Sequence, residues 1–238
     1  MTHVTRMLGR MAAGAKKDRP RLSRDVLVTA AIALADAEGL EAVTVRRLAQ
    51  LQGVAPTALY WHFRDKEQLL DGMAEHLFTE VVLPEARPDD WAGELRDVLA
   101  AVVAVVRPHP EVARLMPTRV LASPAGLRLT DRALGLLRAA GLPAGPIGGI
   151  GLFLLSSSVA MVAAEPGRRL PKDPQEREDA VRVKHASFMA LPPRDFPAVV
   201  AFADQLSDCV DPDDYYAFNL DLLVTGIERT AARLHEPA

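Results

Sequence analysis

The chain is poor in the residues on which several fold classes depend. Its 238 residues include one cysteine, Cys209, which excludes an internal disulfide framework and suits a reducing cytoplasm. Aromatic residues make up only 5% of the chain, whereas β-branched and aromatic side chains dominate β proteins. Alanine and leucine are abundant instead, and both favour helices. We therefore expect an all-α, cytoplasmic protein.

Long apolar runs are also scarce. The first twenty residues are polar and basic, so no secretory signal is visible. One uncharged stretch, residues 147–164, has about the minimum length for crossing a membrane. Gly148, Gly149 and three consecutive serines lower its hydrophobicity. We interpret it as a buried core or interface helix and expect no membrane partner.

The sequence lacks the patterns of a catalytic or metal centre. It has no glycine-rich phosphate loop, no G-x-S-x-G elbow and no paired carboxylates on one expected helix face near a base. The histidines are scattered, and no two of them stand at the i, i+4 spacing of metal ligands. We therefore expect no enzyme, no metal and no other cofactor.

Positive charge is concentrated at one end of the chain. The whole sequence carries a net charge of −3, which alone argues against nucleic acid. However, residues 1–66 contain eleven basic and six acidic side chains, a net +5, whereas the remainder contains 17 and 25, a net −8. Such an asymmetry indicates a basic region that meets an anionic partner. Residues 1–22 are predicted to be a flexible basic arm.

Capping residues predict two helices after the arm. Ser23 is a plausible N-cap for a helix with one apolar face, and Gly39 ends it. Thr44 caps a second, shorter helix, which Gly53 ends after about two turns.

Pro56 opens a third short helix that runs to Phe63, because proline is tolerated in a first turn. Asp65 and Gln68 form a variant capping box and begin a longer helix that runs to about residue 83. A polar, proline-rich loop is expected over 165–175. Further helices are expected over 90–107, 109–116, 124–140, 145–165, 175–190, 195–209 and 213–234.

Two short helices joined at Gly53 and packed on a longer one match a helix-turn-helix. The second short helix must be small enough to enter a major groove and must present polar groups outward. We expect its buried face to be formed by Val54, Leu59 and Phe63, and we assign Trp61 to the core. The outer face would present Thr57, Ala58, Tyr60 and His62.

These residues resemble a known family. The run TVRRLAQLQGVAPTALYWHFRDKEQLL, residues 44–70, resembles the DNA-binding segment of TetR/AcrR-type repressors, with the LYWHF core and the following DKEQLL in register. The resemblance is strong over residues 22–82. Near the carboxyl end, YYAFNLDLLVTGIER, residues 215–229, is similar to the last helix of the tetracycline-repressor subgroup. Between these segments only the length and the helical pattern agree.

The resemblance implies a three-helix DNA-binding head over 23–66 and a ligand-binding and dimerisation body over 67–238, connected by helix 67–83. A dimer would place two recognition helices one DNA turn apart, ~34–36 Å, on a palindromic operator that a small molecule releases. The positions in register with the family's DNA contacts are Thr44, Arg46, Pro56, Thr57, Ala58, Tyr60, His62 and Lys66.

The resemblance also implies that helices 145–165 and 213–234 of two subunits form the dimer interface, where small residues allow close helix approach. The interface residues expected there are Phe153, Ser156, Phe218, Leu222, Thr225 and Gly226. A ligand pocket is expected among the body helices, with ordinary core or surface as the alternative at each position. Its predicted lining residues are His109, Met116, Thr118, Arg119, Phe153, Ser157 and Met161.

The sequence departs from the tetracycline repressors where they hold a magnesium–drug chelate with histidines. Leu115 stands where one such histidine would align, and the helix end near Thr79 lacks another. Tetracycline is therefore not expected, and the effector, the operator and the choice between repression and activation stay open. The alternative function is a helical small-molecule-binding protein whose head does not bind DNA.

Overall fold

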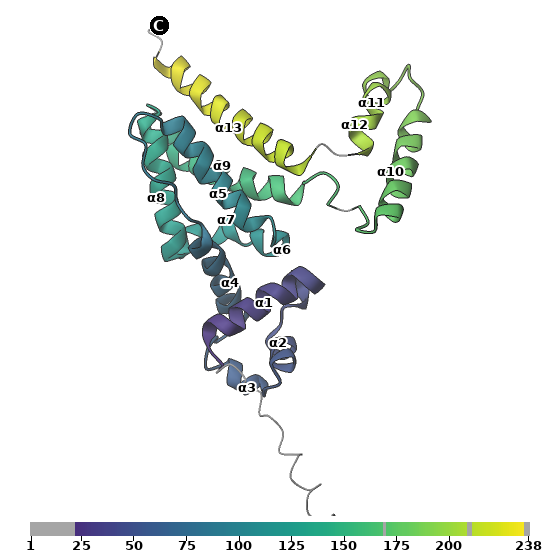
Figure 1. Ribbon diagram of the computed structural model, residues 1–238. Coiled ribbons are helices and arrows are strands. Elements are labelled where there is room, and N and C mark those ends of the chain that lie inside the picture. Colours follow the sequence, from purple (N-terminus) through teal and green to yellow (C-terminus); the bar gives the residue numbers. More distant parts are fainter. Residues whose placement is uncertain (1–21, 169, 209–210, 236–238) are drawn as a thin grey trace, which may run out of the picture.

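The protein is all-helical throughout the ranges that its computed structural model describes, residues 22–168, 170–208 and 211–235. No strand occurs within these ranges. The expected fold class is confirmed by this helix content and by the arrangement of a small lower unit below a larger bundle (Figure 1). The basic arm predicted for residues 1–22 lies outside the described residues except for Leu22, and so does Cys209.

Three helices and a short 3₁₀ turn form the amino-terminal unit, here called the head. They are α1 (Arg24–Glu38), η1 (Leu40–Ala42), α2 (Val45–Gln52) and α3 (Pro56–Leu59). The expected caps are present: the Ser23 hydroxyl accepts from the Val26 N–H and the Thr44 hydroxyl from the Arg47 N–H. These bonds satisfy amide donors that the first helical turns leave free.

Helix α4 (Lys66–Glu80) connects the head to the rest of the chain. The Asp65 carboxylate accepts from the Gln68 N–H, while the Gln68 side chain accepts from the Arg64 N–H. This reciprocal pair fixes where α4 starts, one residue after the cap. The helix ends at Glu80, slightly before the predicted end at residue 83.

The body is a bundle packed around α5 (Trp91–Val106). The other long helices are α8 (Pro124–Ala139), α9 (Ala144–Ala163) and α13 (Pro212–His235). Three short elements join α5 to α8, namely α6 (Pro110–Ala113), α7 (Met116–Arg119) and η2 (Val120–Ala122). The prediction gave one helix over 109–116; the structure instead divides this segment, and Pro117 occupies the first turn of the additional helix α7.

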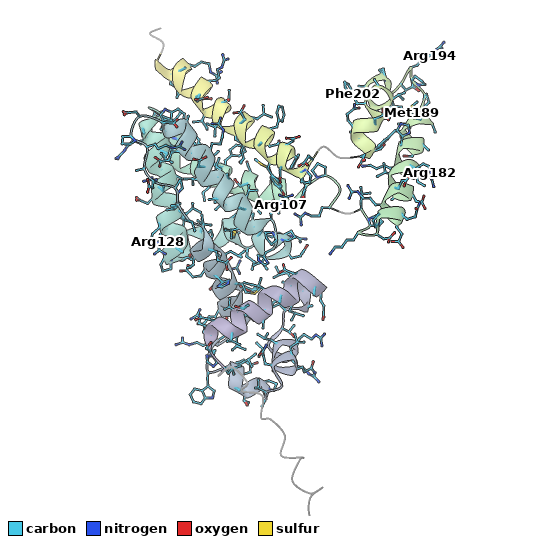
Figure 2. All side chains as sticks on the ribbon, viewed as in Figure 1. Arg107, Arg128, Arg182, Met189, Arg194 and Phe202 are labelled. Carbon is cyan, nitrogen blue, oxygen red and sulfur yellow. The ribbon has the colours of Figure 1, made fainter. Side chains whose placement is uncertain are left out.

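Three helices project from the bundle as an arm: α10 (Pro174–Met189), α11 (Pro197–Ala201) and α12 (Ala203–Ser207) (Figure 1). Figure 2 shows Met189, Arg194 and Phe202 on this arm, away from the body. One continuous helix was predicted over 195–209, and this is wrong. The chain leaves helical geometry at Phe202, and the bend buries Ala203 and Ser207 where α12 packs on α10.

Candidate nucleic-acid interface and ligand cavity

The turn between α2 and α3 is set by Gly53. Its φ of +65° and ψ of 34° place it in the left-handed region, where a Cβ would be disfavoured. The N–H groups of Gly53 and Val54 both donate to the carbonyl of Ala49, which closes the end of α2. The chain can therefore reverse within a few residues and present α3 at an angle to α2.

The inner side of α3 is anchored by Leu59 and Phe63, which are almost fully buried. The Arg24 guanidinium lies over the Phe63 ring, 5.1 Å from its centroid. A Cβ on Gly72 would lie 3.3 Å from the Phe63 ring, so the glycine lets α4 pack closely there. Residues 56–63, here called the recognition segment, thus stand on a dense apolar base.

The outer side of α2 and α3 carries the residues that the sequence predicts to contact DNA. Thr44, Arg46, Pro56, Thr57 and Tyr60 are exposed on this side. Three others are half-buried: Ala58, His62 and Lys66. The structure therefore brings all eight close together in the chain's amino-terminal part: they lie at the cap of α2, on α2 and α3, in the turn after α3 and at the first residue of α4.

Trp61 is exposed over 91% of its surface, so its assignment to the core is wrong. The regular part of α3 ends at Leu59, and the N–H groups of His62 and Phe63 both donate to the Leu59 carbonyl. This tight turn directs Phe63 inward and leaves Trp61 outside. Trp61 therefore adds a large aromatic surface beside Tyr60 that sequence reasoning did not include.

Two adjacent arginines at the start of α2 are placed differently. Arg47 pairs with Glu38 of α1 at 2.6 Å, and the hydrogen bond from this carboxylate raises the pKa of the Arg47 guanidinium. Arg46 is exposed and has no ion pair within the described ranges. Arg46, which is predicted to contact the DNA backbone, is therefore the arginine whose charge is not already paired.

Three side chains of the body make four polar contacts with the head and with α4. The Nδ1 of His109 lies 2.7 Å from a carboxylate oxygen of Asp36 in α1. The Arg119 guanidinium lies 2.7 Å from Glu67 and 2.9 Å from Asp71, both in α4. The fourth carboxylate is Glu75, also in α4, which accepts from the hydroxyl of Ser123 in the body.

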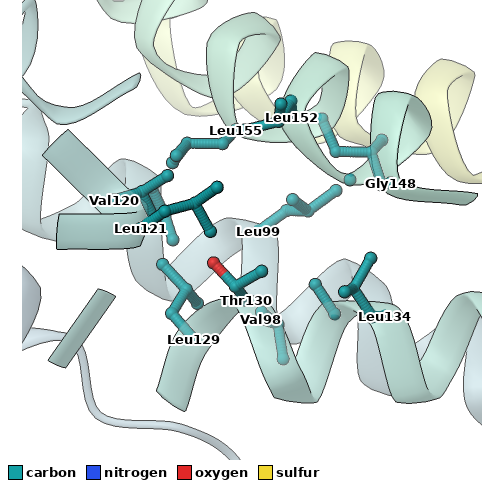
Figure 3. A pocket seen from close by; sticks show the side chains of 14 residues that line it. Val98, Leu99, Val120, Leu121, Leu129, Thr130, Leu134, Gly148, Leu152 and Leu155 are labelled. Carbon is teal, nitrogen blue, oxygen red and sulfur yellow. The ribbon is translucent and has the colours of Figure 1, made fainter. Parts of the chain in front are cut away.

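A cavity of about 190 Å³ lies in the body between α5, η2, α8 and α9 (Figure 3). Fourteen residues line it, and all but Thr130 are glycine, alanine, valine or leucine. No sequence pattern indicates this cavity, because leucines and valines from four separate elements look like ordinary core residues. Only their three-dimensional arrangement leaves a space between them.

None of the seven predicted ligand residues lines this cavity. Ser157 and Met161 line a more open hollow between α9 and α13, Phe153 is exposed on α9, and Met116 is fully buried. Thr118 donates to the Leu115 carbonyl, while His109 and Arg119 make the head contacts above. Their ligand contacts stay predictions.

The predicted dimer residues lie on α9 and α13, which pack against each other. Phe153, Phe218 and Leu222 are exposed over 58%, 65% and 55% of their surfaces. Ser156 and Gly226 are exposed beside them, and Thr225 is half-buried. Both helices thus present an apolar face to solvent.

The structure also bears on membrane crossing and on metal binding. Among the described residues, α9 is the one helix long and apolar enough to cross a membrane, and a third of its most apolar window (33%) is buried within the bundle. No group of three or more histidine, cysteine or acidic side chains in the described ranges is placed to hold a metal ion. Leu115 is buried, and the Thr79 hydroxyl donates to the Glu75 carbonyl.

A three-helix head with an exposed polar recognition segment, carried on a helical body with a cavity, defines a ligand-responsive helix-turn-helix regulator. Comparison with known proteins agrees. Residues 27–73 match the family described as bacterial regulatory proteins, tetR family, and residues 83–231 match the tetracyclin repressor-like C-terminal domain. The chain belongs to the TetR family and is a DNA-binding transcriptional regulator.

Several individual relatives match about nine-tenths of the chain. An HTH-type transcriptional regulator of Saccharopolyspora erythraea is 28% identical over 90% of this chain and 88% of its own. The class C tetracycline repressor protein of Escherichia coli is 28% identical over 88% and 92%. The solved structure of Streptomyces coelicolor ActR in complex with actinorhodin is 28% identical, covers 89% and 99%, and has a TM-score of 0.73. The family is regulatory rather than enzymatic, and its members bind operator DNA as homodimers and respond to small molecules.

Proposed function

We propose that the protein is a repressor that leaves a palindromic operator when its body binds a small molecule, and that it acts in the cytoplasm without catalytic activity. The observation that carries the proposal is the exposed outer side of α2 and α3: Arg46 without an ion pair and Tyr60 exposed over 55% of its surface, both above a buried apolar base. An exposed cation can pair with a phosphate, and an exposed phenol can hydrogen-bond to a phosphate or a base edge, so this surface is suited to duplex DNA.

The contacts divide by chemistry. Thr44, Arg46 and Lys66 stand at helix starts, where side chains and free N–H groups favour phosphate and position the protein without selecting sequence. The other five face the groove, and of these Ala58 suits a thymine methyl while Thr57 and Tyr60 have hydroxyls for base edges or phosphates. The groove-facing residues are Pro56, Thr57, Ala58, Tyr60 and His62.

Release requires that the ligand-bound body prefer a different head position. The ion pairs of Arg119 with Glu67 and Asp71, the Ser123–Glu75 contact and the His109–Asp36 contact join the body to α4 and α1. A shift of the segment 119–123 would therefore move α4, the helix that connects the body to the head. We propose residues 23–66 as the DNA-binding domain and 67–238 as the ligand-binding and dimerisation domain.

The DNA test compares the two neighbouring arginines. Arg46→Ala and Tyr60→Ala should each weaken retardation of the DNA flanking the protein's own gene by about tenfold, since one contact of this kind is worth about 1–3 kcal/mol. Arg46→Ala should also lower the salt dependence by about one counterion. Arg47→Ala is the matched control, because its guanidinium is already paired with Glu38, and it should retain near-normal affinity.

If wild-type protein retards no duplex at any salt concentration, the regulator proposal is wrong. The alternative would then hold, namely a helical small-molecule-binding protein without DNA-binding activity. Equal losses for Arg46→Ala and Arg47→Ala would instead leave the function standing and remove the contact assignment.

The dimer interface is tested on the exposed face of α13. Leu222→Asp should convert the dimer to a monomer in sedimentation experiments, because a charge would be buried against an apolar partner surface. Val183→Asp on α10 is the control. Val183 is at least as exposed (69%), and it lies on the arm formed by α10, α11 and α12. A dimer that survives Leu222→Asp would place the interface elsewhere.

A further inference from the structure

The walls of the body cavity are chemically uniform. Thirteen of the fourteen lining residues have no polar side-chain atom, and the charged side chains of α5, α8 and α9 all lie outside its lining. A carboxylate, an ammonium group or a metal chelate placed here would lose its hydration and gain no ionic or hydrogen-bonded partner. The chemistry of the wall therefore selects against charge.

The volume of the cavity limits the size of the ligand. An apolar cavity of about 150 Å³ in another protein stays dry and holds benzene. The cavity here, about 190 Å³, is somewhat larger, and it is lined by Leu99, Val120, Leu121 and Leu155 among others (Figure 3). It has room for one or two small rings or a short alkyl chain.

Thr130 supplies the one polar group of the wall. Figure 3 shows its hydroxyl oxygen directed into the cavity. No hydrogen-bond partner is present for it among the described residues, unlike the hydroxyls of Thr118 and Ser158, which donate to carbonyls of their own segments. Thr130 is partly buried, and a hydroxyl on the wall of an apolar space is suited to one hydroxyl or carbonyl of a ligand.

We propose that this cavity binds a neutral, largely hydrocarbon ligand of one or two fused rings, or of equivalent alkyl volume, whose single polar atom pairs with Thr130. The proposal rests on the proposed function, because it identifies the chemical class of the molecule that releases the DNA. It also separates this cavity from the residues that the sequence predicts for ligand binding, none of which lies on its wall.

The test uses three probes of one shape: naphthalene, 2-naphthol and naphthalene-2-sulfonate. Binding to the full-length protein is followed by titration calorimetry and by the shift in Tm. Naphthalene should bind and raise Tm, and 2-naphthol should bind about fivefold more tightly, as expected for one added hydrogen bond. The sulfonate should leave Tm unchanged at the same concentration.

Two glycine variants show where the probes bind. Gly148 lines the cavity, and a Cβ there meets no atom within 4 Å, so Gly148→Leu should fill the space and reduce binding of both neutral probes more than tenfold. Gly135→Leu on α8 is the matched control: a Cβ there is equally unobstructed, but the position faces a separate hollow. It should bind the neutral probes normally.

A third variant keeps the test valid if Gly148→Leu fails to fold. Thr130→Val retains the shape of the side chain and removes its hydroxyl, so 2-naphthol affinity should fall to that of naphthalene while naphthalene affinity stays the same or rises. Equal binding of the sulfonate and naphthalene, or undiminished neutral binding in folded Gly148→Leu, would overturn the proposal.

DNA retardation in the same preparations separates this inference from the proposed function. Protein that retards DNA but binds no neutral probe would show that the ligand class is wrong while the regulator stands. Protein that binds neutral probes in the cavity but no DNA would show that the ligand class is right while the regulator proposal is wrong. In the expected case, 2-naphthol should also reduce DNA retardation in wild type and leave it unchanged in Gly148→Leu.

Discussion

The head and the body place their polar and apolar groups in opposite ways. The head has an apolar interior, formed around Leu59 and Phe63, and its chemistry-bearing side chains lie outside. The body buries the charged side chain of Glu94, which is 2% exposed, and it contains an apolar cavity. A unit that inserts into a groove needs a rigid base, whereas a unit that responds to a ligand needs imperfect packing. The difference between the two regions follows from what each must do.

The largest effect is expected from emptying the base of the head. Phe63→Ala removes a buried ring beneath α3 and should lower the free energy of unfolding by about 4 kcal/mol, as measured by urea denaturation. Amide exchange should accelerate most in α1 to α3. Trp61→Ala is the matched control, because this ring is 91% exposed, and its effect should stay within about 0.5 kcal/mol. Equal losses of stability for Phe63→Ala and Trp61→Ala would contradict the turn after α3, which directs Phe63 inward and leaves Trp61 outside.

The next effect tests the buried charge of the body. The Nε of Arg132 lies 2.5 Å from the Glu94 carboxylate, an ion pair that lacks hydrogen-bond alignment. Arg132→Met leaves this carboxylate buried and unpaired, so the free energy of unfolding should fall by about 3 kcal/mol. Arg128→Met, one turn earlier on α8, removes an exposed arginine and should change stability by no more than about 0.5 kcal/mol.

Rescue would confirm the cause of that loss. Adding Glu94→Gln to Arg132→Met removes the unpaired charge and keeps an acceptor for the Arg87 N–H, which now bonds to Glu94 at 2.6 Å. Much of the lost stability should return. If the double variant is no more stable than the single one, the loss comes from packing rather than from charge.

A smaller pair of effects should have opposite signs in the two regions. Gly53→Ala forces a Cβ into left-handed geometry at the α2–α3 turn and should destabilise the head by about 1 kcal/mol. Gly135→Ala lies within α8, where φ is negative and a Cβ meets no atom within 4 Å, so it should stabilise the body by up to about 1 kcal/mol. Changes of the same sign in both variants would contradict this contrast.

The sequence predicted the head more completely than the body because the signals of the head are local. Ser23, Thr44, Gly53, Pro56 and Asp65 each act on the turn in which they stand, so the helix boundaries could be read from single residues. The error at Trp61 arose because α3 ends sooner than its apolar spacing indicates.

The features of the body that matter most are not local. The cavity is lined from four elements, and Arg119 finds Glu67 and Asp71 about fifty residues earlier in the chain. No spacing along the sequence indicates such a contact, because it depends on how α4 and α7 cross. The bend at Phe202 is a further example, since it depends on how α12 packs against α10.

The smallest effect lies where α13 begins against the end of α5. The Tyr216 hydroxyl donates to Glu165, which also pairs with Arg107 and Arg168. Burial, followed by the bond to Glu165, raises the pKa of Tyr216 from 10.0 to about 12. The folded state therefore retains the phenolic proton at pH values where the unfolded state has lost it, and stability falls as the pH rises from 10 through 12.

Tyr216→Phe should cost about 1 kcal/mol at pH 8, the contribution of one hydrogen bond. Because the raised pKa makes the tyrosine's contribution decline above pH 10, the gap between variant and wild type should close between pH 10 and pH 12. Denaturant titrations at both pH values measure the difference, with Tyr60→Phe in the head expected to stay within about 0.5 kcal/mol of wild type at each. A gap that widened with pH would contradict the hydrogen bond that the Tyr216 hydroxyl donates to Glu165.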